Sequence, residues 1–160
     1  MFGLIPGEPV RAGMATDDGT YEYKLQHGDD FGRTYFRLFD GLAISSLGVG
    51  TYLGDPTDAV DSRYRDAIAT ALESGINVVD TAINYRCQRS ERAVGRAIEE
   101  TDVDREAVFV STKGGFLPFE ESRPENPGEY VKREFVDSGL IEREELARGS
   151  HCIAPDFIDD

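Results

Sequence analysis

Two short apolar runs, 35–39 and 42–45, open the regular part of the chain. They flank Asp40-Gly41, a dipeptide typical of two-residue hairpin turns, and both are rich in aromatic or aliphatic side chains. This pattern predicts a β-hairpin. A third strand is expected over 47–53, which is again largely apolar and is followed by turn-forming residues.

The next stretch has the periodicity of an amphipathic helix. Apolar side chains recur at helical spacing, which places them on one face of a helix of about 18 residues. They are Val60, Tyr64, Ala67, Ile68, Ala71 and Leu72. Gly75 follows this stripe, and a glycine just past the last turn commonly ends a helix.

Two further runs, 76–81 and 107–113, are short and mostly apolar, which predicts strands buried on both faces. A second helix is expected between them from about Ser90. The resulting alternation of strand and helix is typical of parallel strands joined by right-handed helical crossovers. Such strands belong to a doubly wound sheet or to a (β/α) barrel.

The flanking segments lack this alternation. Residues 1–34 are rich in Gly, Asp, Thr and Pro without sustained apolar periodicity, so we expect an irregular extension there. Residues 116–150 are acidic and contain three early prolines, which predicts a surface insertion with an amphipathic helix near 129–147. Residues 156–160 resemble the first turn of a further helix.

The charge of the chain excludes several classes of partner. Its 160 residues include 31 acidic and 17 basic side chains, a net charge of −14. Such a surface repels nucleic acids and anionic membranes, so neither is expected as a partner. The excess of carboxylates favours the interpretation that the protein is adapted to high salt, where self-repulsion between the charges is screened. A secretory signal and a membrane-spanning apolar stretch are both missing from the sequence, which predicts a cytoplasmic protein.

Three polar residues are expected at the carboxyl ends of the buried strands, where α/β proteins place their active sites. Asp80 ends one strand, Tyr85 lies in the loop after it, and Lys113 ends the next strand. Parallel neighbours are about 4.8 Å apart, so Asp80 and Lys113 come within reach of an ion pair. A buried Lys113 would lower the pKa of Tyr85 from its usual value of about 10, making it a proton donor at neutral pH. Asp80 would hold the ammonium in place.

Two alternatives concern other kinds of site. The glycines of 48–54 resemble a dinucleotide-binding fingerprint, but Asp55 and Pro56 separate them from the helical stripe, which begins at Val60. This spacing disfavours a Rossmann-type domain, which stays an alternative. No metal site is expected, because the two cysteines lie 65 positions apart without a metal-binding pattern around them.

Four motifs, in this order, resemble the N-terminal part of an aldo/keto reductase. They are SLGVGTYLG at 46–54, GINVVDTAINY at 75–85, SERAVGRAI at 90–98 and VSTKGG at 110–115. The resemblance implies an α/β fold, a partial (β/α)8 TIM barrel with the N-terminal hairpin closing its bottom and about three βα units. Residues 35–160 would then be the N-terminal part of the barrel, truncated before the fourth strand.

The resemblance also implies an activity, the reduction of a small carbonyl compound to an alcohol with NADPH or NADH. It makes Tyr85 the proton donor, tuned by Lys113 and Asp80. It places four residues beside the nicotinamide and its ribose: Gly50, Thr51, Tyr52 and Asp80.

Some parts of the family pattern have no match in these residues. The histidine after the fourth barrel strand and the loops that hold the adenosine phosphate are missing, so we expect little or no turnover by the chain alone. A C-terminal half would come from a continuation of the reading frame or from a separate chain. The alternative is a non-catalytic half-barrel or interaction module that needs a partner.

Overall fold

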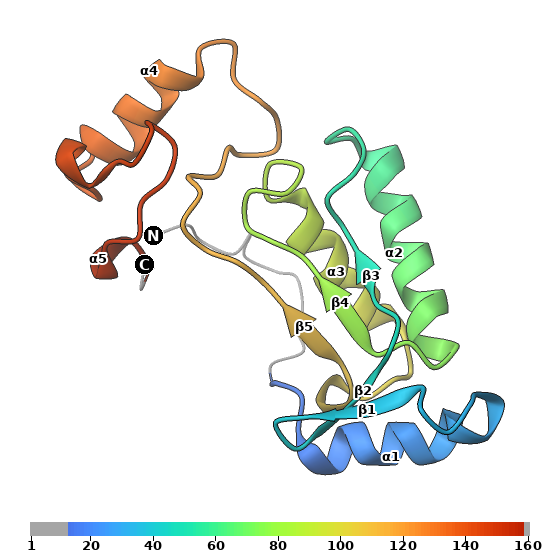
Figure 1. Ribbon diagram of the computed structural model, residues 1–160. Coiled ribbons are helices and arrows are strands. Elements are labelled where there is room, and N and C mark those ends of the chain that lie inside the picture. The colour runs from blue at the N-terminus through green and yellow to red at the C-terminus, as the bar shows by residue number, and fades with distance from the viewer. Residues whose placement is uncertain (1–12, 159–160) are drawn as a thin grey trace.

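The computed structural model describes residues 13–158, which form an α/β structure (Figure 1). Its helices are α1 (Asp17–His27), α2 (Asp58–Glu73), α3 (Arg89–Glu100), α4 (Pro127–Val131) and α5 (Pro155–Ile158). Its strands are β1 (Phe36–Phe39), β2 (Leu42–Ser45), β3 (Val49–Gly50), β4 (Val78–Asp80) and β5 (Phe109–Ser111).

The predicted hairpin is confirmed. β1 and β2 pair antiparallel, with Phe39 opposite Leu42 at the turn. Asp40 and Gly41 have φ angles of 47° and 88°, and a two-residue type I′ turn needs positive values at both positions.

A separate parallel sheet has the order β3-β4-β5. Val79 in the central strand is paired with Val49 on one side and Val110 on the other. The strands are shorter than their apolar runs, and β3 has only two residues. The predicted alternation of strands and helices is confirmed, and within residues 13–158 the sheet is open and does not close into a barrel.

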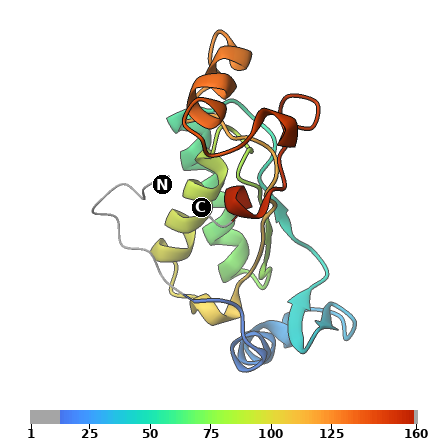
Figure 2. The ribbon, with the colours of Figure 1, turned by 90° about the vertical axis from the view of Figure 1, so that its left-hand side faces the viewer.

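Helices α2 and α3 cover one face of this sheet (Figure 2). The core between helices and sheet consists of Ile68, Leu72, Val79, Val94, Ala97, Ile98 and Val108. Burying a side chain such as Leu72 stabilises a fold by about 1.5–3 kcal/mol, so this core fixes the strands from which the loops of the site emerge. Gly75 follows α2 with a φ of 91°, as predicted for a glycine just past a helix end.

The described part of the N-terminal segment is helical, unlike the irregular extension that the sequence predicts. α1 begins after Thr16, whose side chain accepts a hydrogen bond from a backbone N–H of the first turn. Only Thr20 and Tyr23 of this helix are buried, so it lacks the broad apolar stripe that would reveal it in the sequence. Tyr23 Oη donates to the carbonyl of Leu72, which ties α1 to α2. The rest of this prediction, over 1–12, lies outside the described residues.

The segment 116–158 lies at the opposite end of the sheet from α1 (Figures 1 and 2). It has a small hydrophobic core of its own, formed by Leu117, Val131, Phe135, Ile141 and Cys152. The single helix predicted near 129–147 is wrong. α4 passes into a π-helical turn at Lys132–Val136, and a 3-10 turn follows at Arg143–Glu145. The predicted start of a further helix is α5.

No helix within residues 13–158 is long and apolar enough to cross a membrane. The same residues hold no cluster of three or more His, Cys, Asp or Glu side chains that could bind a metal ion. Cys87 and Cys152 are both free thiols.

Candidate active site

Strands β4 and β5 bring two charged residues together. Asp80 ends β4 opposite Ser111, and Lys113 follows two residues later, just beyond β5. Lys113 Nζ donates to both carboxylate oxygens of Asp80, at 2.8 Å each, and to the carbonyl of Thr81, also at 2.8 Å. The ion pair expected from the strand ends is therefore present.

Lys113 is less buried than the sequence predicts. The side chains of Lys113 and Asp80 are each 47% exposed, because Lys113 lies in the loop after β5 and not within the sheet. Its hydrogen bond to Asp80 raises the pKa of Lys113 above the ordinary value; partial desolvation opposes this, and Tyr85 adds to the rise. The ammonium therefore stays charged at neutral pH without being buried.

Tyr85 lies against this ion pair. Lys113 Nζ is 5.0 Å from the centroid of the Tyr85 ring, within the range of a cation–π contact. The Tyr85 and Tyr52 rings meet edge to face with centroids 5.1 Å apart. Tyr52 is 65% exposed, so the two rings border the solvent. The structure thus gathers Asp80, Tyr85 and Lys113 in one place, with Tyr52 beside them.

Thr51 links the ends of β3 and β4 through buried hydrogen bonds. Its N–H and its hydroxyl both donate to the carbonyl of Asp80, each at 3.1 Å, and its own carbonyl accepts from Ser90 Oγ at 2.7 Å. Thr51 is fully buried, so its polar groups are engaged inside the protein and support the loop. Gly50 and Tyr52, on either side, are exposed at the same edge.

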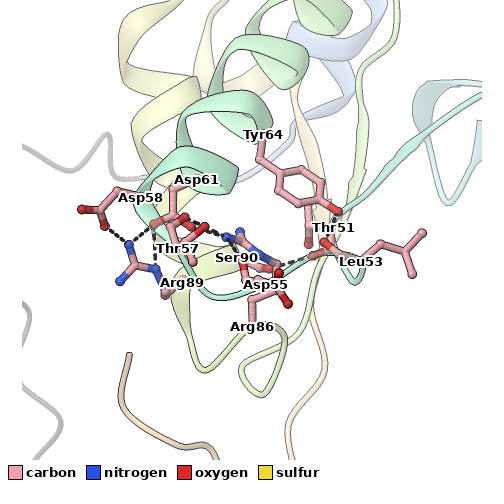
Figure 3. A network of polar contacts seen from close by, with 10 residues as sticks. All are labelled: Thr51, Leu53, Asp55, Thr57, Asp58, Asp61, Tyr64, Arg86, Arg89 and Ser90. Carbon is pink, nitrogen blue, oxygen red and sulfur yellow. Dashed lines mark hydrogen bonds and ion pairs between the residues drawn. The ribbon is translucent and has the colours of Figure 1, made fainter. Parts of the chain in front are cut away.

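A cluster of charges beside the site, largely buried except for Asp58 at its rim, is not predicted by the sequence (Figure 3). This Arg86 cluster consists of Arg86, Arg89, Asp58 and Asp61. Its acidic members come from the start of α2, and its arginines from the loop after β4 and the start of α3. The paired residues are 25 to 31 positions apart, so no local sequence pattern marks them.

The glycines of the third apolar run do not form a dinucleotide-binding turn. α2 begins at Asp58, four positions beyond Gly54, whereas in the fingerprint the helix opens on the glycines. The geometry at this turn agrees with the spacing argument against a Rossmann-type site.

Comparison with known proteins decides the family. The sequence model of the Aldo/keto reductase family matches residues 46–143. The chain belongs to the aldo/keto reductase family. The match includes both strand ends that carry the Asp80–Lys113 pair, and it confirms the resemblance of the four motifs.

Several reductases are similar to this aldo/keto reductase chain. An aldo-keto reductase of Mycobacterium sp. (strain MCS) is 37% identical over 86 residues, 54% of this chain and 28% of the relative. Glycerol 2-dehydrogenase (NADP(+)) of Saccharomyces cerevisiae is 41% identical over 76 residues, covering 48% and 22%. Methylglyoxal reductase of Escherichia coli (strain K12) is 35% identical over 80 residues, covering 50% and 26%. The matched part thus spans 22–28% of the length of these relatives.

Proposed function

We propose that this chain supplies the proton-donating part of a site that reduces a small carbonyl compound to an alcohol. The observation that carries the proposal is the position of the Lys113 ammonium. Both oxygens of Asp80 hold it, and it lies 5.0 Å from the centroid of the Tyr85 ring. An acidic group held beside a fixed positive charge is what proton transfer to a carbonyl oxygen requires.

Each of the three residues has a separate task. Tyr85 Oη–H donates its proton to the carbonyl oxygen of the substrate as negative charge develops there. Lys113 stabilises the phenolate that remains, because a nearby opposite charge favours the ionised form. Asp80 keeps the ammonium in one position through two charge-assisted hydrogen bonds.

The surroundings of the pair fit a nicotinamide nucleotide. Asp80 is 47% exposed on its side chain, so its oxygens can accept further hydrogen bonds, as from a ribose hydroxyl. A side chain at Gly50 would meet no atom within 4 Å, which leaves open space beside the site. Tyr52 offers an exposed aromatic ring at the same edge. When bound, the reduced nicotinamide supplies the hydride for the carbonyl carbon.

The names of the relatives guide the choice of probes. The yeast relative is named for glycerol and NADP(+), and the bacterial one for methylglyoxal. We therefore infer NADP(H) as the cofactor and a small carbonyl compound as the substrate. NADPH and methylglyoxal are the corresponding probes.

We further infer that β3, β4 and β5 are successive strands of a (β/α)8 barrel whose bottom the β1–β2 hairpin closes. The parallel strand order and the two helices on one face support this. A closed barrel takes about 250 residues, so the reaction requires further strands, from additional sequence or from a second chain. These 160 residues alone are expected to show little or no turnover.

The test is NADPH oxidation with methylglyoxal by the completed barrel that contains these residues. Tyr85→Phe should lower kcat by about 10²–10⁴-fold, the contribution typical of a general acid. Tyr21→Phe is the matched control, because Tyr21 is 51% exposed and lies on α1 at the far end of the sheet. Full activity of the Tyr85→Phe enzyme would overturn the proposal.

A non-catalytic interaction module is the second candidate. Large apolar side chains at the surface favour it, including Leu38 at 74% and Leu53 at 73% exposure. This candidate predicts tight association with a second polypeptide and no binding of NADPH. Calorimetric titration of the completed protein with NADPH distinguishes the two candidates, since only the reductase is expected to bind NADPH.

A further inference from the structure

We propose that Arg86 is a positioning residue that fixes the left-handed turn directly after Tyr85 and thereby holds the Tyr85 ring beside Lys113. This inference rests on the proposed role of Tyr85 as proton donor. It is carried by backbone conformation, burial and hydrogen bonds around the turn.

The turn has an unfavourable backbone. Arg86, Cys87 and Gln88 have φ angles of 51°, 58° and 70°, three successive positive values without a glycine. A Cβ atom in this region approaches the following carbonyl oxygen, so residues other than glycine visit it singly. A run of three persists only where the surrounding contacts impose it.

Arg86 provides such contacts on one side of the turn (Figure 3). Its Nε and Nη2 donate to the carbonyl of Asp55, at 3.2 and 3.0 Å. Nη2 also donates to the carbonyl of Thr57 at 3.4 Å and to the carboxylate of Asp61. The guanidinium lies 5.0 Å from the centroid of the Tyr64 ring. The Arg86 side chain is 1% exposed, so these bonds hold the loop after β3 to the turn without competition from water.

Arg89 fixes the acidic end of this arrangement. Its Nε donates to the Asp61 carboxylate at 2.8 Å, and its Nη2 binds Asp58. The hydrogen bond to Asp61 is the main cause that raises the pKa of Arg89. Within residues 13–158, the Arg89 side chain hydrogen-bonds to carboxylates, whereas Arg86 also holds backbone carbonyls. Arg89 is therefore a matched control for Arg86.

Other bonds tie the end of the turn to the segment after β5. Gln88 Nε2 donates to the Glu120 carboxylate at 2.8 Å, and the carbonyl of Cys87 accepts from the N–H of Glu121 at 3.1 Å. These bonds restrain the second and third residues of the turn. The first residue of the turn is Arg86, which follows the proton donor and is restrained by the bonds of its own side chain.

Tyr85 depends on the turn for the direction of its ring. Its carbonyl accepts a long hydrogen bond, 3.4 Å, from the N–H of Ser90. Its ring must stay 5.0 Å from Lys113 Nζ and 5.1 Å from the Tyr52 ring. A change of Arg86 to a negative φ would redirect the chain where it leaves Tyr85 and move the ring away from the ammonium.

The test compares Arg86→Lys with Arg89→Lys. Lysine keeps the positive charge but lacks the planar fork that serves a carbonyl and a carboxylate at once. The readout is the nuclear Overhauser contact between the ring protons of Tyr52 and Tyr85 in the full chain, which needs no turnover. We expect this contact to be lost in Arg86→Lys and retained in Arg89→Lys.

Cys87→Gly separates positioning from a purely structural role. Glycine adopts positive φ without steric cost, so a turn with glycine at its centre depends less on Arg86. In the double variant Arg86→Lys/Cys87→Gly we expect the ring contact to return. If Arg86 acted only through its bond to Asp61, a glycine at position 87 could not compensate for the loss of that bond.

The outcomes distinguish this inference from the proposed function. A folded Arg86→Lys chain that keeps the ring contact would overturn the inference. An Arg86→Lys chain that unfolds, or loses the contact, without recovery on adding Cys87→Gly would also overturn it. Loss of the contact with full reductase activity in the completed barrel would support positioning and count against Tyr85 as the proton donor.

Discussion

The Arg86 cluster and the Lys113–Asp80 pair both adjoin the loop that carries Tyr85, yet they differ in exposure. The side chains of Arg86 and Asp61 are 1% and 16% exposed, whereas those of Lys113 and Asp80 are each 47% exposed. A buried pair is stable only while each partner stays in place, so it restrains geometry. A half-exposed pair contributes less to stability but stays accessible to a ligand. The comparison separates residues that shape the site from residues that act in it.

The largest expected effect is a loss of stability on removing the buried side chain of Arg86. Arg86→Met removes the buried guanidinium and its hydrogen bonds to the carbonyls of Asp55 and Thr57 and to the Asp61 carboxylate, which Arg89 still binds, so the free energy of unfolding should fall by about 2–4 kcal/mol. Lys113→Met is the counterpart at the exposed pair and should cost about 0–1 kcal/mol. Urea unfolding measures both. Equal losses in the two variants would contradict the division between them.

The exposed pair should instead control the reaction. In the completed barrel, Lys113→Met should lower kcat/KM by about 10²-fold or more, because the phenolate of Tyr85 loses its stabilising charge. Lys132→Met is the control, since Lys132 forms a comparably exposed ion pair with Asp137 on the segment after β5. Steady-state assays with NADPH and methylglyoxal compare the variants. Equal activity of the two lysine variants would refute the role of Lys113.

Alkaline pH should weaken only the exposed pair. The pKa of Lys113 is raised above 10.5 in the folded chain, so the stability from its ion pair is fully present below pH 10.5. That stability is lost as the pH rises through the raised pKa. The difference in unfolding free energy between wild type and Lys113→Met, under about 1 kcal/mol, should therefore vanish at high pH. The corresponding difference for Arg86→Met should persist, because arginine stays protonated. A Lys113 difference that is constant across this range would be contrary to expectation.

Salt should have the smallest effect on the comparison. Molar KCl screens exposed charges and leaves buried pairs largely unscreened, so the stability cost of Arg86→Met should not change. The wild-type melting temperature should rise in molar KCl, because self-repulsion from a net charge of −14 is reduced. Calorimetric melting at low and molar KCl tests both expectations. A protein that is more stable at low salt would contradict the predicted adaptation to high salt.

Local signals in the sequence predict much of the framework and the two charged residues at the strand ends. Asp40-Gly41 predicts the hairpin turn, and Gly75 predicts the end of α2. Asp80 and Lys113 each follow an apolar run, and parallel pairing of those runs is sufficient to bring them together. A strand end is a local feature, which is why its chemistry can be inferred without coordinates.

Burial of a charge is not a local feature. Arg86 binds the carbonyl of Asp55 and the carboxylate of Asp61, 31 and 25 positions away, and only the folding of α2 against the following βα unit brings them together. The sequence predicts Lys113 as buried and does not single out Arg86. The structure shows the opposite exposures.

Sparse apolar contacts explain the other differences. α1 buries only Thr20 and Tyr23, too few for a helical period to be recognised. In the acidic segment after β5, the charged surface masks a core around the fully buried Phe135. A helix that packs through two side chains, or a small core within a highly charged segment, leaves little periodicity in the sequence.

The most direct test of the central claim is a single-turnover measurement in D2O. If Tyr85 Oη–H donates the proton as hydride is transferred, reduction by the completed wild-type barrel should be slower in D2O than in H2O. In Tyr85→Phe the remaining slow reaction takes its proton from another donor, so its solvent isotope effect should differ from that of the wild type. An identical isotope effect and rate in the two proteins would show that the proton comes from elsewhere.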